Sequence, residues 1–131
     1  MLALAPQAIE KRLTAMPEAE VRGASAGSAF VVLTHDHALD FLMTREVLAR
    51  DDAAYAGMIG SKTKRASFNN WVRREGGGEI NSARLICPMG NSSLKDKRPE
   101  VISALIAAQV IEGLSDHSKK KLQNSQQYLS I

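Results

Sequence analysis

The sequence contains a single cysteine and few aromatic residues, which make up 5% of its 131 residues. Cys87 alone cannot form an internal disulfide, and this fits a reducing compartment. No apolar run approaches the roughly 18 residues needed to cross a membrane. The first ten residues also lack the basic leader and the apolar segment of a secretion signal. We therefore expect a cytoplasmic protein that does not associate with a membrane.

The net positive charge is also small, since the formal net charge is only +3, and the lysines and arginines are spread over several segments. A nucleic-acid-binding surface needs a denser basic stripe. The hydrophobic fraction of 44% and the length are ordinary for one globular domain. The charge pattern therefore excludes nucleic acid as the expected partner and favours a local anion site.

A strand-to-helix junction lies at Gly60. Residues 54–59 form a short apolar run of mostly small side chains, as in a buried strand. Ser61 opens the next segment, in which Phe68, Trp71 and Val72 have helical spacing. Such a junction gathers free backbone N–H groups and the positive end of the helix dipole. Ser61 alone could equally be a simple helix N-cap.

Three cations follow this junction at once: Lys62, Lys64 and Arg65. Cations in a first helical turn oppose the dipole by about 0.3–1 kcal/mol each, and an anion would remove that conflict. The alternative is that the three side chains extend into water. The spacing Gly-Ser-x-x-Lys-Arg differs from the P-loop, and no nucleophile-elbow pattern is present.

Strands and helices alternate along the chain, which predicts an α/β protein. We expect strands at 28–34, 54–59 and 85–87, and helices at 6–16, 39–50, 61–75 and 99–113, with a loop over 17–28. The last helix is apolar on most sides and is expected to be largely buried. This order predicts a short parallel sheet flanked by helices in a three-layer fold. We divide the chain into an N-terminal helix and loop (1–27), a Rossmann-like domain (28–113) and a polar tail (114–131), which we expect to be a loose helix or disordered.

The loops that follow the three strands should converge, because ligands bind beyond the carboxyl ends of parallel strands. Several of these residues have simpler interpretations. Asp36 could be only a helix N-cap, Cys87 could be a small buried hydrophobe, and the imidazoles of His35 and His37 diverge on a turn, which disfavours a metal site. The candidate site comprises Thr34, His35, Asp36, His37, Gly60, Ser61, Lys64, Arg65, Cys87, Gly90 and Asn91.

Four motifs in this order resemble the C-terminal Rossmann-like domain of the xanthine dehydrogenase accessory protein XdhC. They are Val31-Val-Leu-Thr-His-Asp-His-Ala-Leu-Asp40, Ala54-Tyr-Ala-Gly-Met-Ile-Gly-Ser-Lys-Thr-Lys-Arg65, Cys87-Pro-Met-Gly90 and Lys97-Arg-Pro-Glu-Val-Ile-Ser-Ala-Leu-Ile-Ala-Ala108. The resemblance covers residues 28 to 112.

The resemblance implies a molybdenum-cofactor chaperone rather than an enzyme. Such a protein binds the molybdopterin cofactor, protects it while a cysteine desulfurase supplies its terminal sulfur, and passes it to xanthine dehydrogenase. From the position of the loops we expect Ser61, Lys64 and Arg65 to take the cofactor phosphate and Thr34 to His37 to meet the pterin ring. Cys87 matches the Cys-Pro-x-Gly motif of the family and is expected to face the metal centre.

The chain also departs from the family pattern. Members usually open this domain with a strand and a Gly-x-Gly turn, and residues 1–27 match neither. We therefore expect a truncated or separately encoded form, and a homodimer that covers the open edge of the strand at 28–34. Two other functions remain: a fragment of a nicotinamide-dependent Rossmann oxidoreductase, and an interaction module that binds no ligand.

Overall fold

The computed structural model describes residues 9–75, 80–90 and 96–129, without the side chains of 126–129. The described elements are α1 (Pro17–Gly23), β1 (Ala29–Val32), α2 (His37–Arg50), β2 (Tyr55–Met58), α3 (Lys62–Arg74), the short 3₁₀ helix η2 (Ser82–Arg84) and α4 (Pro99–Leu129). None of the helices in this part of the chain is long and apolar enough to span a membrane.

The two strands form a parallel sheet in which β2 is central. Ala29 pairs with Tyr55 and Val32 with Met58, and Gly57 forms one further parallel bridge to Ile86 on the other side of β2. All four residues of β2 are buried, as expected for a strand covered on both faces. The strand expected at 85–87 is thus reduced to a single bridge, while the strands expected at 28–34 and 54–59 are confirmed at their centres.

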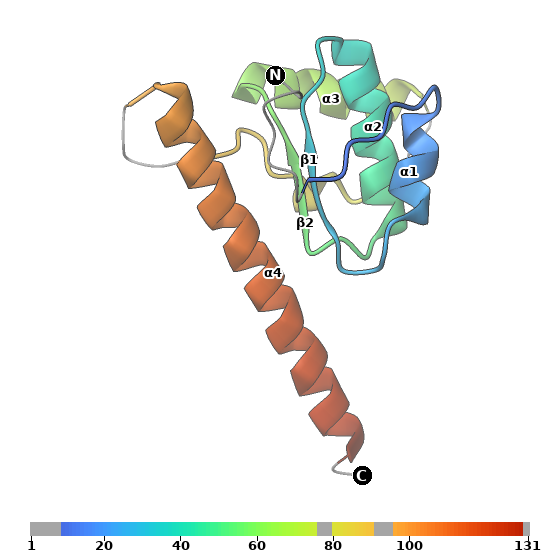
Figure 1. Ribbon diagram of the computed structural model, residues 1–131. Helices are drawn as coiled ribbons and strands as arrows, with labels where there is room; N and C mark the ends of the chain where they lie inside the picture. Colours follow the sequence, from blue (N-terminus) through green and yellow to red (C-terminus); the bar gives the residue numbers. More distant parts are fainter. Residues whose placement is uncertain (1–8, 76–79, 91–95, 130–131) are drawn as a thin grey trace.

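Helices cover both faces of the sheet (Figure 1), so the partial Rossmann-like fold is confirmed. The helices α2 and α3 lie on one face, where Phe41, Phe68 and Trp71 pack with ring centroids 5.5–6.1 Å apart. Phe68 and Met58 are completely buried at this contact. The helix α4 crosses the opposite face, and α1 packs against α2.

The N-terminal segment differs from the prediction. Residues 9–16 are irregular, so the helix expected at 6–16 is wrong over that part; residues 1–8 lie outside the described residues. A helix forms instead at α1, where a loop was predicted. Pro17 at its start, Glu18 and Glu20 in its first turn and Arg22 in its last turn all favour this helix.

The helix α4 differs from the prediction in its length and its burial. It continues past Gly113 to Leu129, so the tail, expected to be a loose helix or disordered, is helical up to that residue. The helix was expected to be largely buried, but none of its residues from 99 to 125 is buried. A sheet of two strands covers only one side of such a helix, so apolar side chains on the other side remain exposed. Among the described residues no strand pairs with the edge of β1 away from β2, and Leu33 just beyond the strand is 65% exposed.

Candidate functional site

Hydrogen bonds tie together the three loops that leave the carboxyl ends of the strands. Asp40, in the first turn of α2, accepts the backbone N–H of Thr34 at 2.8 Å and the Lys64 ammonium at 2.6 Å. The Cys87 thiol lies 3.6 Å from the carbonyl oxygen of Gly60 and 3.7 Å from that of Ser61. The structure therefore brings the predicted segments to one edge of the sheet.

Most polar groups of the first loop shape the start of α2. Asp36 is the N-cap, and its carboxylate accepts the N–H of Ala38 at 2.9 Å. The Thr34 hydroxyl donates to the Asp36 carbonyl at 2.9 Å. His35 and His37 are exposed. Among the described residues, no three His, Cys, Asp or Glu side chains are placed to hold a metal ion.

Lys64 is held inside the protein rather than presented to a ligand. Its ammonium also donates to the Ile59 carbonyl at 2.8 Å, and its side chain is only 12% exposed. Its partner Asp40 is 1% exposed. Burial alone would raise the pKa of the Asp40 carboxyl, but the hydrogen bonds from Lys64 and Thr34 outweigh it and hold that pKa below its usual value.

Gly60 makes room for this lysine. Its φ is 155°, and a Cβ at this position would overlap the Cδ of Lys64. Lys64 cannot easily yield, because its ammonium is bound to Asp40 and Ile59. The glycine is therefore required by the path of the lysine chain as well as by the turn. Ser61 then caps α3, since its hydroxyl accepts the N–H of Lys64 at 3.2 Å.

Arg65 is also engaged internally. Its guanidinium donates to the carbonyl oxygen of Cys87 at 3.1 Å and to that of Ser82 at 3.4 Å, and so connects α3 to the loop that follows η2. Gly90, in the same loop, has a φ of 67° and donates its N–H to the Gln109 side-chain oxygen at 3.0 Å. Asn91 lies outside the described residues.

The Cys87 thiol is buried, with 3% of the residue exposed. Burial raises the pKa of this thiol, although the nearby charges of Lys64 and Arg65 act in the opposite direction. At neutral pH the side chain is therefore a protonated thiol that packs against the α3 junction, and not a thiolate.

A hollow of about 610 Å³ lies beside these loops. It is bounded by α3, η2, the Cys87–Pro88 segment and α4. Two of its polar residues are absent from the predicted site. They are the exposed Lys62 and the half-buried Gln109. The sequence carried a signal for both, since Lys62 is a first-turn cation and Gln109 interrupts an otherwise apolar helix face. The residues that line the hollow are Lys62, Arg65, Ala83, Leu85, Ile86, Cys87, Pro88 and Gln109.

Gln109 joins α4 to this edge of the sheet. Its side-chain oxygen accepts the Tyr55 hydroxyl at 3.1 Å and the Gly90 N–H at 3.0 Å. One oxygen thus serves donors from β2 and from the third loop. This arrangement fixes the wall of the hollow that α4 provides.

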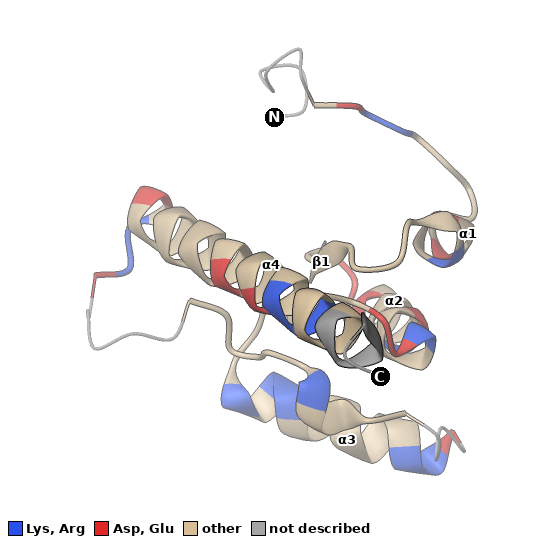
Figure 2. Ribbon diagram, turned by 90° about the horizontal axis from the view of Figure 1, so that it is seen from below, with Lys and Arg blue, Asp and Glu red and all other residues tan. Residues whose placement is uncertain are grey.

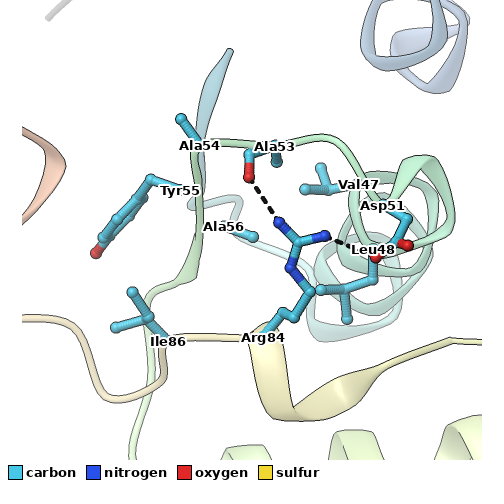
Figure 3. A pocket seen from close by; sticks show the side chains of 9 residues that line it. All are labelled: Val47, Leu48, Asp51, Ala53, Ala54, Tyr55, Ala56, Arg84 and Ile86. Atoms are coloured by element: carbon cyan, nitrogen blue, oxygen red, sulfur yellow. Dashed lines mark hydrogen bonds and ion pairs between the residues drawn. The ribbon is translucent and has the colours of Figure 1, made fainter. Parts of the chain in front are cut away.

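A second, smaller hollow of about 140 Å³ lies near the start of β2, at the opposite end of the strand from Gly60. Figure 3 shows the Arg84 side chain reaching across it toward Asp51 and Ala53. The guanidinium pairs with the Asp51 carboxylate at 2.6 Å and donates to the Ala53 carbonyl at 2.9 Å. These contacts join η2 to the end of α2, so Arg84 has a structural role here.

The helix α3 carries most of the positive charge near the larger hollow. From Lys62 to Arg74 it contains lysines and arginines at both ends and no acidic residue (Figure 2). With Lys64 and Arg65 engaged internally, Lys62 is the exposed cation at the N-terminal end of the helix. The hollow is therefore suited to one anionic group at its α3 side.

A comparison with protein families agrees with this architecture. The family model described as the XdhC Rossmann domain matches residues 2–110, which is most of the chain. The protein belongs to the XdhC family. No curated protein and no solved structure gives a significant match.

Membership of the XdhC family gives the protein an accessory role at the family level, and it connects the chain with xanthine dehydrogenase. The carboxyl edge of the sheet, where ligands bind in open α/β folds, is the place at which the first three of the XdhC motifs quoted above converge. The Thr34 to Asp40 motif and the Gly60 to Arg65 motif meet in the ion pair of Asp40 and Lys64.

Proposed function

We propose that this protein binds the molybdenum cofactor at the carboxyl edge of its sheet and assists the sulfuration of the cofactor and its insertion into xanthine dehydrogenase. The supporting observation is the hollow beside Lys62, Cys87 and Gln109 at the N-terminal end of α3. Its volume of about 610 Å³ lies within the usual range of about 300–1,000 Å³ for ligand pockets. Family membership supports the class of ligand.

The residues present fit the anionic end of such a cofactor. The Lys62 ammonium is exposed, and the first backbone N–H groups of α3 lie beside it. A phosphate here would offset the conflict between the cation and the helix dipole. Lys64 and Arg65 contribute indirectly, because they hold the loops that shape the hollow.

Gln109 and the Cys87–Pro88 segment would bound the other side of the cofactor. The cofactor supplies redox chemistry once it is installed in its target enzyme. The residues of this chain bind its anionic group and shield one side of it. The buried thiol of Cys87 takes part through packing, because its pKa is raised and its Sγ is engaged by two carbonyl groups.

A titration with molybdopterin, followed by the fluorescence of Trp71, tests this proposal. We expect Lys62→Ala to weaken binding about tenfold at low salt, with a smaller effect at high salt, because a charge-assisted contact to phosphate is lost. Arg73→Ala is the matched control, since it removes a cation from the other end of the same helix.

The proposal fails if the wild-type protein does not bind molybdopterin, or if Lys62→Ala and Arg73→Ala bind it equally well. Saturable binding of NAD in place of molybdopterin would instead support the oxidoreductase reading. Binding of neither would leave an interaction module. Pull-down with a cysteine desulfurase and with apo xanthine dehydrogenase then tests the two protein partners.

A further inference from the structure

One side of α4 is fixed to the sheet. Gln109 bonds to Tyr55 and Gly90, and a Cβ at Gly113 would lie 3.0 Å from the Ala54 carbonyl oxygen. One turn further on, His117 packs against Gly27. A Cβ added at Gly27 would lie 2.9 Å from the Nε2 of His117. The half-buried positions of the helix all lie on this side: Val101, Leu105, Ile106, Gln109, Val110, Gly113 and His117.

The opposite side of α4 carries an uncharged row of exposed residues, which we name the outer stripe. Its large members are Ile111, 66% exposed, and Leu122, 64% exposed. The spacing of three and four residues is that of a helix that packs against another helix. The outer stripe comprises Ala104, Ala108, Ile111, Ser115, Ser118, Leu122 and Ser125.

The C-terminal part of α4 extends past the sheet (Figure 1). Residues 118–125 are all exposed. A helical segment of this length is marginal in water unless an apolar face is packed. The outer stripe continues along this overhang through Leu122, so a partner that covers the stripe would also stabilise the overhang.

We propose that the outer stripe binds α4 of a second copy of this chain in antiparallel orientation. The natural register places Ser115 beside Ser118 of the second copy, and Ile111 beside Leu122. The overhang of each copy, residues 118–125, then lies along the part of the second copy's α4 that packs on the sheet of that second copy. The sheets remain on the outer sides of the helix pair, because each packs on the side of α4 opposite to the stripe.

The charges beside the outer stripe favour this orientation. In the antiparallel register, Glu112 of each copy flanks Lys119 of the other, and symmetry produces the contact twice. A parallel pair would instead place Lys119 and Lys121 of each copy near the same lysines of the other copy, where they repel. Small residues at Ala108, Ser115 and Ser118 allow the two backbones to approach closely.

Sedimentation velocity of the full chain tests the interface. We expect a dimer at micromolar concentration, and we expect Leu122→Asp to weaken dimerisation by at least about 100-fold, because both copies lose a buried leucine. Lys120→Glu is the control, since it changes a charge on the same helix but away from the outer stripe. We expect it to remain a dimer.

Charge exchange tests the orientation. Glu112→Lys alone and Lys119→Glu alone should each weaken the homodimer, because each places like charges together twice. Mixing these two variants should restore dimers, because the mixed pair regains both opposite-charge contacts. Mixed dimers that are no tighter than the two homodimers would overturn the antiparallel register.

Two results would overturn the proposal as a whole: a wild-type monomer at micromolar concentration, and a dimer that survives Leu122→Asp. If such a dimer is lost in Leu33→Lys, the interface lies at the open edge of β1, as the sequence predicted. Molybdopterin titration of the Leu122→Asp variant, in whichever oligomeric state it is found, separates a failure of the interface from a failure of the proposed function.

Discussion

Replacing Lys64 by methionine would leave the buried Asp40 carboxylate without its cation. The two charged groups lie 2.6 Å apart, and their exposed fractions are 12% and 1%. With an effective dielectric constant of about 20, the Coulomb attraction at this distance is about 6 kcal/mol. Much of it offsets the loss of hydration when both charges are buried.

The net cost of breaking such a pair from one side is about 3–5 kcal/mol. We expect about 3 kcal/mol for Lys64→Met, because the backbone N–H of Thr34 still binds Asp40. Asp40→Asn should cost less, about 2 kcal/mol, since an amide oxygen can still accept from Thr34 and Lys64 keeps the Ile59 carbonyl. The double variant should cost about 2 kcal/mol less than the sum of the two single changes.

Urea unfolding followed by Trp71 fluorescence measures these free energies. With a slope of about 1.5 kcal/mol per molar urea, Lys64→Met should lower the midpoint by about 2 M. Lys11→Met removes an exposed lysine and should change the free energy of unfolding by less than about 0.5 kcal/mol. A Lys64→Met cost below about 1 kcal/mol, with additive single effects, would refute the buried ion pair.

The same pair predicts a dependence on pH. The pKa of Asp40 is lower in the folded protein than in the unfolded chain. The contribution of Asp40 to stability is therefore complete at a pH above the ordinary carboxyl pKa of about 3.8. It is lost as the pH falls through the lower pKa that Asp40 has in the folded protein. The difference in unfolding free energy between wild type and Asp40→Asn should shrink over that range. A difference independent of pH would contradict the assignment.

Three further predictions concern the rest of the fold. Because the Cys87 thiol is buried with a raised pKa, iodoacetamide at pH 8 should modify it only after unfolding in urea, as measured by mass spectrometry; rapid labelling of the native protein would contradict this. Phe68→Ala should lower the free energy of unfolding by about 3–5 kcal/mol and shift Trp71 emission to longer wavelength, because it empties the centre of the aromatic cluster. Arg84→Ala should cost about 1 kcal/mol, since its partner Asp51 is largely exposed, and a thermal melt unchanged from wild type would show that this contact is unimportant.

The strands and the helices α2 and α3 could be predicted because their signals are local. The apolar β-branched residues before Thr34 and the small apolar residues before Gly60 are typical of buried strands, and the structure places strands there. The helix at 39–50 was expected from the helical spacing of Leu39, Leu42, Met43 and Val47, and that spacing describes its buried side only in part. Leu42 is 43% exposed, while Asp40 and Thr44 are buried, because the helix presents these polar residues to the protein interior.

Long-range contacts could not be predicted from the sequence pattern. The pairing of Lys64 with Asp40 joins residues 24 positions apart, and nothing local distinguishes a lysine that will be buried from one that faces a ligand. Gly113 is predicted to end a helix, but it lies inside α4. A glycine is needed at this position because the Ala54 carbonyl oxygen approaches the helix too closely for a larger residue. At Pro17, by contrast, the signals for a helix start are present in the sequence, but the small polar residues and the glycines of 17–28 favoured a loop in the prediction.

The double contact made by Gln109 restricts how α4 can move. A slide of one helical turn, about 5.4 Å, would break both hydrogen bonds and bring a bulkier side chain against the Ala54 carbonyl where Gly113 now lies. Translation along the sheet is therefore blocked, whereas bending beyond His117 disturbs none of these contacts. The slowest-exchanging amides of this helix should accordingly cluster around residue 109, and protection should decline steadily toward its C-terminal end.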